Sequence, residues 1–329
     1  MANQPEDKMA RAIFRRGDLH ETTPPGKVAV IGCGHVGAAI AYALCIENLC
    51  SEVALVDVDE KKLQGELTDL QHAAAWAETC ISGDTSLDVT KGSKLCVVTA
   101  TAPHDEDNLL EKNVAIFKEL IPQLVQLCPN CLLLVVTNPV ETMTYVAWKL
   151  SGLPESRVLG AGTVLDSARF RWGLARRLGV HPSAVRAGVS GAHEDILVFN
   201  WCGVHVSGTP LLAVKKDICK EENTFTNEIK QASKDIVSGK GYVSWGVALG
   251  VAAICRALLL NTLEILPVAT YVKGCRHSSD RSDVFLSMAS VLCENGVHSV
   301  VKSQLTTNER YAIIDVAKQQ LSAQADTGV

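Results

Sequence analysis

Three ionisable side chains in the second half of the chain are of types that could carry out acid–base chemistry together. Asp166 and Arg169 lie in the segment LDSAR, three residues apart, which places both on one face of a predicted helix. His193 lies in SGAHED, in a predicted turn just after a strand. A histidine can give a proton to a carbonyl oxygen and take it back, a carboxylate can fix the histidine's tautomer, and an arginine can bind a carboxylate through two parallel hydrogen bonds. The spacing alone leaves an alternative open, in which Asp166 and Arg169 form an ordinary surface ion pair and His193 has no special role.

A glycine-rich segment near the beginning of the chain predicts a dinucleotide site. Lys27–Ala41 reads KVAVIGCGHVGAAIA, in which a β-type run leads into Gly32-x-Gly34-x-x-Gly37 and then into residues at helical spacing. The first glycine allows a tight turn, the second lets a pyrophosphate approach the backbone, and the third lets helix and strand pack closely. Free N–H groups at the start of the helix attract the phosphates. Asp57 closes the next apolar run, EVALVDV, where its carboxylate would bind a ribose 2′-hydroxyl and repel a 2′-phosphate, which favours NAD over NADP.

The first half of the chain alternates between strand and helix. Because the strands are nearly continuous runs of Val and Leu, they predict an α/β fold with a Rossmann-type, doubly wound parallel sheet that helices cover on both faces. A ligand of such a sheet lies beyond the carboxyl ends of the strands, where the sequence places Gly32, Asp57, Thr99 and Asn138. The predicted strands are Val28–Ile31, Val53–Val56, Leu95–Thr99, Leu132–Thr137 and Val158–Leu159, and the predicted helices are Val36–Glu47, Glu60–Ala77, Leu109–Leu127 and Val140–Leu150.

The pattern changes after about residue 162 and predicts an α+β substrate domain. We therefore divide the chain into an N-terminal arm (1–24), a NAD-binding Rossmann domain (25–162) and a catalytic domain (163–329). The join at Gly160–Gly162 is short, so the two domains should form one rigid unit with a cleft. Predicted helices here are Val164–Leu178, Asn223–Ile236, Trp245–Leu260 and Asn308–Leu321, and β-like runs are Val185–Val189, Ile196–Trp201, Val268–Val272 and Val284–Ser287.

Composition excludes several classes of protein. A net charge of −5 without a basic patch argues against a nucleic-acid partner. The longest apolar stretch, Trp245–Leu260, contains Arg256 and lies in mid-chain, which indicates a buried helix rather than a membrane span. The cysteines lie mostly inside apolar runs, as expected of reduced thiols in a cytosolic protein, and Cys128-Pro-Asn-Cys131 reads as a helix-to-strand turn rather than a redox or zinc motif. The first 25 residues lack a secretory signal, and Lys8–Arg16 predicts a basic surface arm that packs on a neighbouring subunit.

Longer segments resemble the lactate/malate dehydrogenase family. They are ALVDV (54–58), GELTDLQH (65–72), VVTNPVETMTYVAWKLSGLP (135–154), LDSARFR (165–171), LGVHPSAV (178–185), KGY (240–242) and DVFLS (283–287), and the resemblance runs from about Lys27 to about Leu321. It implies a cytoplasmic, homotetrameric, NAD-dependent dehydrogenase of the L-lactate type that acts on a small 2-keto or 2-hydroxy acid.

The resemblance also assigns roles to individual residues. It implies His193 as the acid/base, Asp166 as its partner, Arg169 as the anchor for the substrate carboxylate, Asn138 beside the substrate oxygen and the nicotinamide, and Val136 as a backbone contact. No metal ion, membrane or nucleic acid is expected to take part. The predicted cofactor-binding residues are Gly32, Gly34, His35, Val36, Gly37, Asp57, Thr99, Val136 and Asn138.

The substrate loop departs from the family pattern. This loop normally carries an arginine that polarises the substrate carbonyl, whereas no arginine occurs here between Arg16 and Arg157. Residues 99–113 form a shorter loop with an acidic stretch (DED), which would repel an anionic keto acid. His104 and Lys112 are the candidates for a substitute cation.

Other departures lie beside the predicted catalytic residues. Glu194 adjoins His193 and should favour its protonated form, while Val243 and Ala161 stand where the family has a threonine facing the substrate and a serine bonding the nicotinamide amide. Losing one positioned charge typically costs about 10²–10³ in rate. The leading hypothesis is therefore a 2-hydroxy-acid dehydrogenase weakened by loss of the loop arginine. The alternative is a catalytically quiet NAD-binding homologue with a structural or regulatory role. A malate dehydrogenase fits less well, because its lid needs a second cation.

Overall fold

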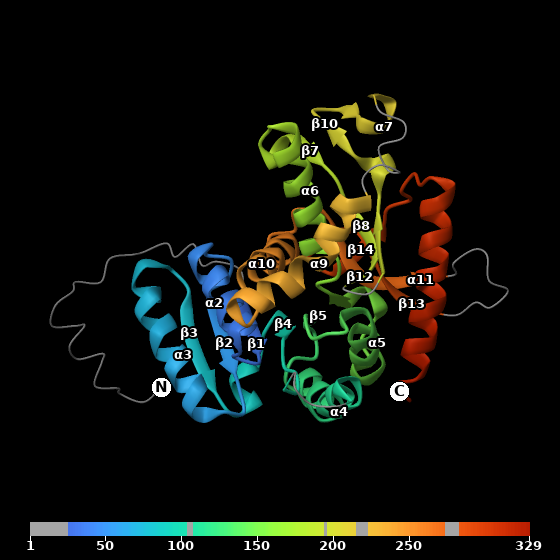
Figure 1. The fold of residues 1–329 in the computed structure, drawn as a ribbon. Helices are drawn as coiled ribbons and strands as arrows, with labels where there is room; N and C mark the ends of the chain where they lie inside the picture. Colours follow the sequence, from blue (N-terminus) through green and yellow to red (C-terminus); the bar gives the residue numbers. More distant parts are fainter. Residues whose placement is uncertain (1–25, 104–107, 194–195, 215–222, 274–282) are drawn as a thin grey trace, which may run out of the picture.

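The first half of the chain forms a parallel sheet. The computed structural model describes residues 26–103, 108–193, 196–214, 223–273 and 283–329, whose arrangement Figure 1 shows. The strands of this half lie in the order β3-β2-β1-β4-β5-β6, which is that of a doubly wound dinucleotide-binding sheet. They are β1 (Lys27–Ile31), β2 (Glu52–Val56), β3 (Cys80–Asp84), β4 (Leu95–Val98), β5 (Leu132–Val135) and β6 (Val158–Gly160).

Alternate residues of these strands supply two separate cores. In β1, Val28 and Val30 belong to the core on one face of the sheet, and Ala29 and Ile31 belong to the core on the other. All residues of β4 and β5 are buried, because helices cover both faces. The predicted Rossmann-type architecture is therefore confirmed. Its helices are α2 (His35–Ile46), α3 (Glu60–Ala73), α4 (Leu109–Leu127) and α5 (Val140–Ser151).

The second half extends the same sheet with antiparallel strands. β12 pairs with β6 at Ala269 and Gly160, and the sheet continues in the order β13, β8 and β9. β14 pairs with the C-terminal part of β13. A small separate sheet combines β7, β10 and β11. These strands are β7 (Val185–Arg186), β8 (Val189–Ala192), β9 (Ile196–Phe199), β10 (His205–Val206), β11 (Thr209–Pro210), β12 (Ile265–Lys273), β13 (Asp283–Cys293) and β14 (Gly296–Val300).

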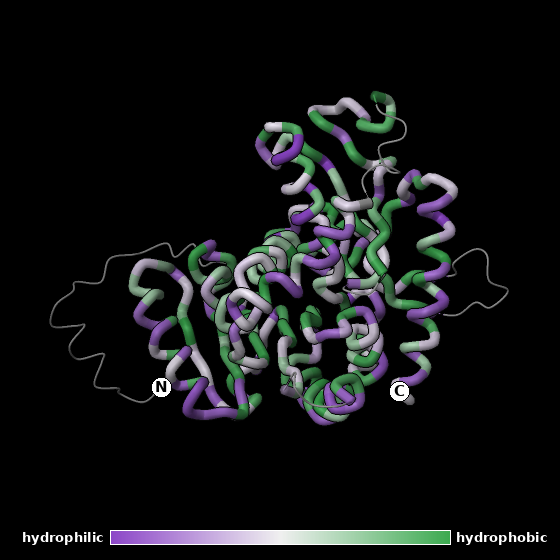
Figure 2. Tube along the Cα trace, in the orientation of Figure 1, coloured by the Kyte–Doolittle hydropathy of each residue, from purple (hydrophilic) through white to green (hydrophobic). Residues whose placement is uncertain are grey.

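One helix of the second half lies on the first. α10 (Trp245–Leu259) packs along α2, and its buried residues, such as Val251 and Leu258, join the core that contains Val28 and Val30. This explains the apolar composition that predicted a buried helix. Figure 2 shows hydrophobic residues along the central strands and alternating polar and apolar residues along the outer helix α11. The other helices of this half are α6 (Val164–Leu178), α7 (Leu211–Val214), α9 (Asn223–Lys240) and α11 (Thr307–Ala325), and the short 3₁₀ helices of the chain are η1 (Ala74–Trp76), η2 (Leu87–Thr90), η3 (Glu155–Arg157), η4 (Pro182–Ala184) and η5 (Trp201–Gly203).

The structure corrects several predicted boundaries. The predicted strand Val185–Val189 is divided between β7 and β8, which belong to different sheets. The predicted helix Glu60–Ala77 ends as α3 at Ala73 and continues as one 3₁₀ turn. β3 and β14 were not predicted, because edge strands with few buried residues lack a continuous apolar run. The predicted N-terminal arm, Glu194 and residues 104–107 of the substrate loop lie outside the described residues.

The cysteines lie mostly in the interior, and Cys128 and Cys131 lie between two elements. No cysteine in the described ranges forms a disulfide, and most are buried. α4 ends at Leu127 and β5 begins at Leu132, so Cys128 and Cys131 do lie in a helix-to-strand turn. Across the described ranges, no helix combines the length and the apolar character that a membrane span requires.

Candidate active site

Missing side chains shape the glycine turn after β1. Gly32 has a φ of +99°, and a Cβ placed there would lie 2.8 Å from Thr99 Oγ1. A Cβ on Gly37 would lie 1.8 Å from the carbonyl oxygen of Gly32. Gly34 instead faces open space, with Lys62 Nζ as the nearest atom at 3.8 Å. The turn therefore closes tightly at its first and third glycines and leaves room at the second, where a pyrophosphate would approach the backbone.

Hydrogen-bonding groups around the turn fit a dinucleotide. No side chain caps the N-terminus of α2 at Gly34, so within the described residues its first N–H groups are left to a ligand. The Asp57 carboxylate follows β2 and accepts hydrogen bonds from the backbone N–H groups of Cys33, at 2.6 Å, and Asp59, at 3.0 Å. These bonds fix the carboxylate beside the turn and leave it acceptor capacity for ribose hydroxyls. The cradle at the turn and this carboxylate fit NAD.

The ends of β4 and β5 border the same region. The Thr99 hydroxyl lies 2.8 Å from the carbonyl oxygen of Gly32, to which it donates, so this side chain braces the glycine turn. Val136 N donates to the carbonyl of Val98 at 2.8 Å, and the carbonyl of Asn138 accepts from Asn113 Nδ2 at 3.0 Å. The structure thus places Thr99, Val136 and Asn138 at the carboxyl edge of the sheet. Their contacts with a cofactor stay predictions.

His193 and Asp166 form a close pair. His193 Nδ1 lies 2.6 Å from Asp166 Oδ2, although the two residues are far apart in the sequence. Asp166 lies in the first turn of α6, where the positive end of the helix dipole favours a carboxylate. Its side chain is 2% exposed and that of His193 is 13% exposed, so little water competes with the contact. With Nδ1 occupied by the carboxylate, the imidazole can exchange a proton through Nε2.

Arg169 shares the same carboxylate. Its Nη1 lies 3.3 Å from Asp166 Oδ1 and donates to Ser233 Oγ of α9 at 3.0 Å. The side chain is 14% exposed. Because these contacts use one guanidinium nitrogen, Nη2 and Nε are not engaged by them and could meet a substrate carboxylate. The structure therefore brings Asp166, Arg169 and His193 together, as their residue types predicted. Their roles in a reaction stay predictions.

Glu141 is a member of the cluster that sequence reasoning missed. Its carboxylate is 1% exposed and accepts from the backbone N–H of His193 at 3.2 Å and from the hydroxyl of Ser287 at 2.5 Å. Burial raises the pKa of Glu141 to about 7. The hydrogen bond from Ser287 and the attraction of His193 lower this pKa, but by less than burial raises it. The one available signal was a lone carboxylate in the otherwise apolar helix of NPVETMTYVAW.

The Glu141 contact brings the two halves of the predicted site together. Glu141 lies in the first turn of α5, three residues after Asn138, and His193 lies just after β8 in the second half. The bond from the His193 backbone N–H to Glu141 therefore holds the residue after β8 against the first turn of α5. The structure therefore connects the carboxylate-held imidazole of His193 to the segment that follows β5, at the carboxyl edge where the glycine turn also lies.

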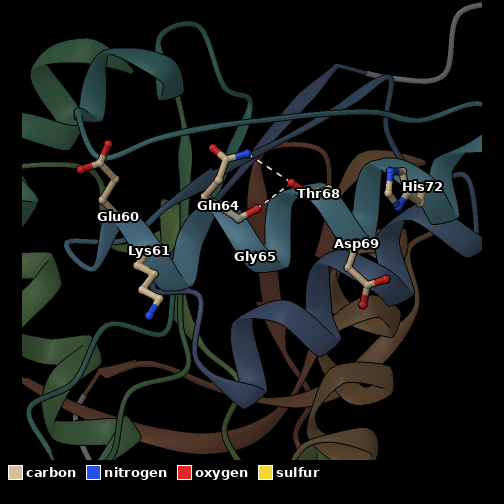
Figure 3. A pocket seen from close by; sticks show the side chains of 7 residues that line it. All are labelled: Glu60, Lys61, Gln64, Gly65, Thr68, Asp69 and His72. Carbon is tan, nitrogen blue, oxygen red and sulfur yellow. Dashed lines mark hydrogen bonds between the residues drawn. The ribbon is translucent and has the colours of Figure 1, made fainter.

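A shallow depression lies elsewhere, on the outer face of α3. Its lining residues, which include Lys61, Asp69 and His72, all belong to that one helix, as Figure 3 shows, and none is a predicted site residue. Within the ranges that the structure describes, no group of three or more His, Cys, Asp or Glu side chains could hold a metal ion.

Comparisons with known proteins agree with this geometry. The model of the lactate/malate dehydrogenase NAD binding domain matches residues 26–160, and that of the lactate/malate dehydrogenase alpha/beta C-terminal domain matches residues 163–329. The chain is 42% identical to an L-lactate dehydrogenase A chain of Danio rerio over 305 residues, which cover 90% of this chain and 91% of that protein. It is 43% identical to an L-lactate dehydrogenase B-B chain of Danio rerio, with 87% and 88% covered, and 41% identical to an L-lactate dehydrogenase B chain of Gallus gallus, with 88% and 89% covered.

Proposed function

Because this chain belongs to the lactate/malate dehydrogenase family and carries its NAD-binding domain, we propose that it transfers hydride between NAD and a small 2-keto or 2-hydroxy acid of the L-lactate type. The observation that supports this substrate class best is the buried contact of 2.6 Å between His193 Nδ1 and Asp166, with Arg169 on the same carboxylate. A proton donor and a carboxylate anchor so close together suit a substrate that has a carbonyl next to a carboxylate.

Each residue of this cluster has a distinct task in the proposed reaction. Bound NAD supplies the hydride acceptor or donor. In keto-acid reduction, protonated His193 gives the proton on Nε2 to the substrate oxygen, and Asp166 stabilises the charged imidazole and fixes its orientation. Arg169 holds the substrate carboxylate with two parallel hydrogen bonds, and Asn138 bonds the substrate oxygen. In the reverse direction His193 takes the proton back.

The substrate loop should make this reaction slow. No arginine occurs between Arg16 and Arg157, so the loop lacks the arginine that polarises the substrate carbonyl in the family pattern. Removing one such positioned charge typically lowers a rate by about 10²–10³. We therefore expect measurable turnover at a reduced rate, with NAD preferred over NADP because of Asp57.

Steady-state kinetics test the proposal. Purified protein should oxidise NADH with at least one member of a panel of 2-keto acids, and His193→Ala should abolish this turnover while NADH still binds. A vertebrate L-lactate dehydrogenase run in parallel validates the panel. Absence of turnover across the panel, with NADH bound, would overturn the proposed activity.

The changed loop also supports a second candidate, a catalytically quiet NAD-binding homologue with a structural or regulatory role. The two candidates differ in how the protein–NADH complex responds to oxamate, a pyruvate analogue. In the presence of NADH, the temperature of thermal unfolding should rise further when oxamate is added if the substrate site binds this analogue. A quiet homologue should gain stability from NADH and nothing more from oxamate.

We further propose that the chain acts in the cytoplasm as a homotetramer. The free, buried thiols of the described residues suit a reducing compartment. Exposed tryptophans, Trp172 on α6 at 56% and Trp245 on α10 at 63%, suit faces that other copies cover. The shallow depression on the outer face of α3, where Gly65 has no side chain (Figure 3), could accept a helix of a second copy. Light scattering after size-exclusion chromatography should give four times the chain mass, and a monomer would contradict the proposal.

A further inference from the structure

Two rings meet beside the glycine turn. The imidazole of His35 stacks on the phenol ring of Tyr242, with centroids 3.8 Å apart and an interplanar angle of 12°. His35 is the first residue of α2, and Tyr242 lies just before α10. Since α2 and α10 pack along each other, the stack joins the N-terminal ends of two helices from different halves of the chain.

The tyrosine ring is itself held in place. Tyr242 is half-buried, and Lys240 Nζ lies 4.3 Å from the centroid of its ring. The same ammonium donates to Ser244 Oγ at 3.1 Å. Because cation–π and stacking contacts both constrain the plane of the phenol, Tyr242 can fix the plane of the His35 imidazole.

The imidazole of His35 has unused hydrogen-bonding capacity. His35 is exposed, and among the described residues no hydrogen-bond partner takes either of its ring nitrogens. It adjoins Gly34, whose missing side chain opens the space where the pyrophosphate would approach, and it heads the helix whose first N–H groups are uncapped. A ring fixed by its face, with its nitrogens open, is suited to bind an anionic oxygen at this place.

We propose that the His35 imidazole is a ligand of the pyrophosphate of bound NAD, and that Tyr242 is the positioning residue that holds this ring. The imidazole donates a hydrogen bond to a phosphate oxygen and supplements the N–H groups of α2. The inference rests on NAD binding alone and does not need His193 to act in catalysis. It can therefore be tested with nucleotides that undergo no reaction.

Calorimetric titration of the full chain with AMP, ADP and NADH tests the proposal, because AMP lacks the pyrophosphate that ADP and NADH contain. His35→Ala should weaken ADP and NADH about 10-fold, the effect of one hydrogen bond to a charged group, and change AMP less than 2-fold. Tyr242→Leu should weaken ADP about 2- to 10-fold, and Tyr242→Phe, which keeps the ring, should match the unmodified protein. In the double variant, Tyr242→Leu should add little to His35→Ala, since both remove the same contact.

Matched controls separate this effect from general changes. His298→Ala on β14 and Tyr311→Ala on α11 remove exposed rings of the same types and should leave all three affinities unchanged. His193→Ala should also bind ADP normally, so a failure of the catalytic proposal would not resemble a failure here. Unchanged ADP affinity in His35→Ala, or an equal loss for AMP and ADP, would overturn the proposal. If His35→Ala does not fold, His35→Phe keeps a ring on Tyr242 but has no ring nitrogen, and it should weaken ADP about 10-fold while changing AMP less than 2-fold. If Tyr242→Leu does not fold, Tyr242→Met, which also lacks the ring, takes its place with the same expected result.

Discussion

At the scale of single residues, one carboxylate organises the candidate active site. Asp166 is 2% exposed and lies within 3.3 Å of atoms of both Arg169 and His193. A buried carboxylate is unfavourable unless cations or donors surround it, so each member of the cluster depends on the others. Because Asp166 contacts both side chains, replacing it tests the mechanism more directly than replacing Arg169 or His193.

Asp166→Asn should leave the shape of the site but remove the charge that supports the imidazolium. We expect kcat for keto-acid reduction to fall by about 10²–10⁴, the range typical of lost acid–base assistance. NADH affinity, measured by fluorescence titration, should change less than 3-fold, because Asp57 and the glycine turn are untouched. A kcat within 3-fold of the unmodified value would show that Asp166 does not support His193.

Glu141 makes a prediction about pH. Its pKa is raised from the ordinary value of 4.5 to about 7, so the folded chain holds a proton that the unfolded chain has already lost in this range. The resulting contribution to the free energy of unfolding is complete below about pH 4.5 and is lost as the pH rises toward 7. In urea unfolding at pH 5, 6, 7 and 8, the free energy of unfolding of the unmodified protein should therefore fall relative to that of Glu141→Gln as the pH increases. A difference that stays constant with pH would contradict this account.

The residues of the site differ in how far the sequence could predict them. Asp166, Arg169 and His193 have chemically distinctive types at short spacings, and the structure does bring them together. Glu141 could not be predicted, since its partners His193 and Ser287 are distant in the sequence and only the pairing of β13 with β8 brings them close.

At the scale of elements, the glycine turn is the part that the sequence predicted best. Its strand, turn and helix are local, so residue spacing alone determines them. Edge strands such as β3 and β14 depend on pairing with distant strands, and their short, half-exposed segments carry no strong local signal. The division of the predicted strand Val185–Val189 likewise depends on distant partners. Its first residues pair within the small sheet as β7, and Val189 begins β8 in the large sheet.

The turn gives a prediction at this scale. Gly37→Ala would place a Cβ 1.8 Å from the carbonyl of Gly32, so the turn must open and the pyrophosphate cradle must distort. We expect NADH affinity to fall more than 10-fold, as measured by fluorescence titration. Gly239→Ala in α9 is the matched control, because a Cβ there meets no atom within 4 Å, and it should leave affinity unchanged and stabilise the helix by up to about 1 kcal/mol. Normal NADH binding by Gly37→Ala would contradict the role of the turn.

At the scale of the whole molecule, one sheet and several contacts join the two halves of the chain. β12 pairs with β6, α10 covers a face of the parallel sheet, and Glu141 ties the His193 loop to α5. The sequence indicated the α/β and α+β halves from their patterns. It could not indicate that one sheet runs through both, because that depends on the contact between Ala269 and Gly160, far apart in the chain.

The most direct measurement follows the hydride itself. NADH that carries deuterium at both C4 positions of the nicotinamide is incubated with 2-keto acids, and the products are examined by mass spectrometry and NMR. We predict a 2-hydroxy acid with deuterium at C2 from the unmodified protein and none from His193→Ala, although both bind the labelled cofactor. Bound cofactor without any labelled product from the unmodified protein would contradict the account.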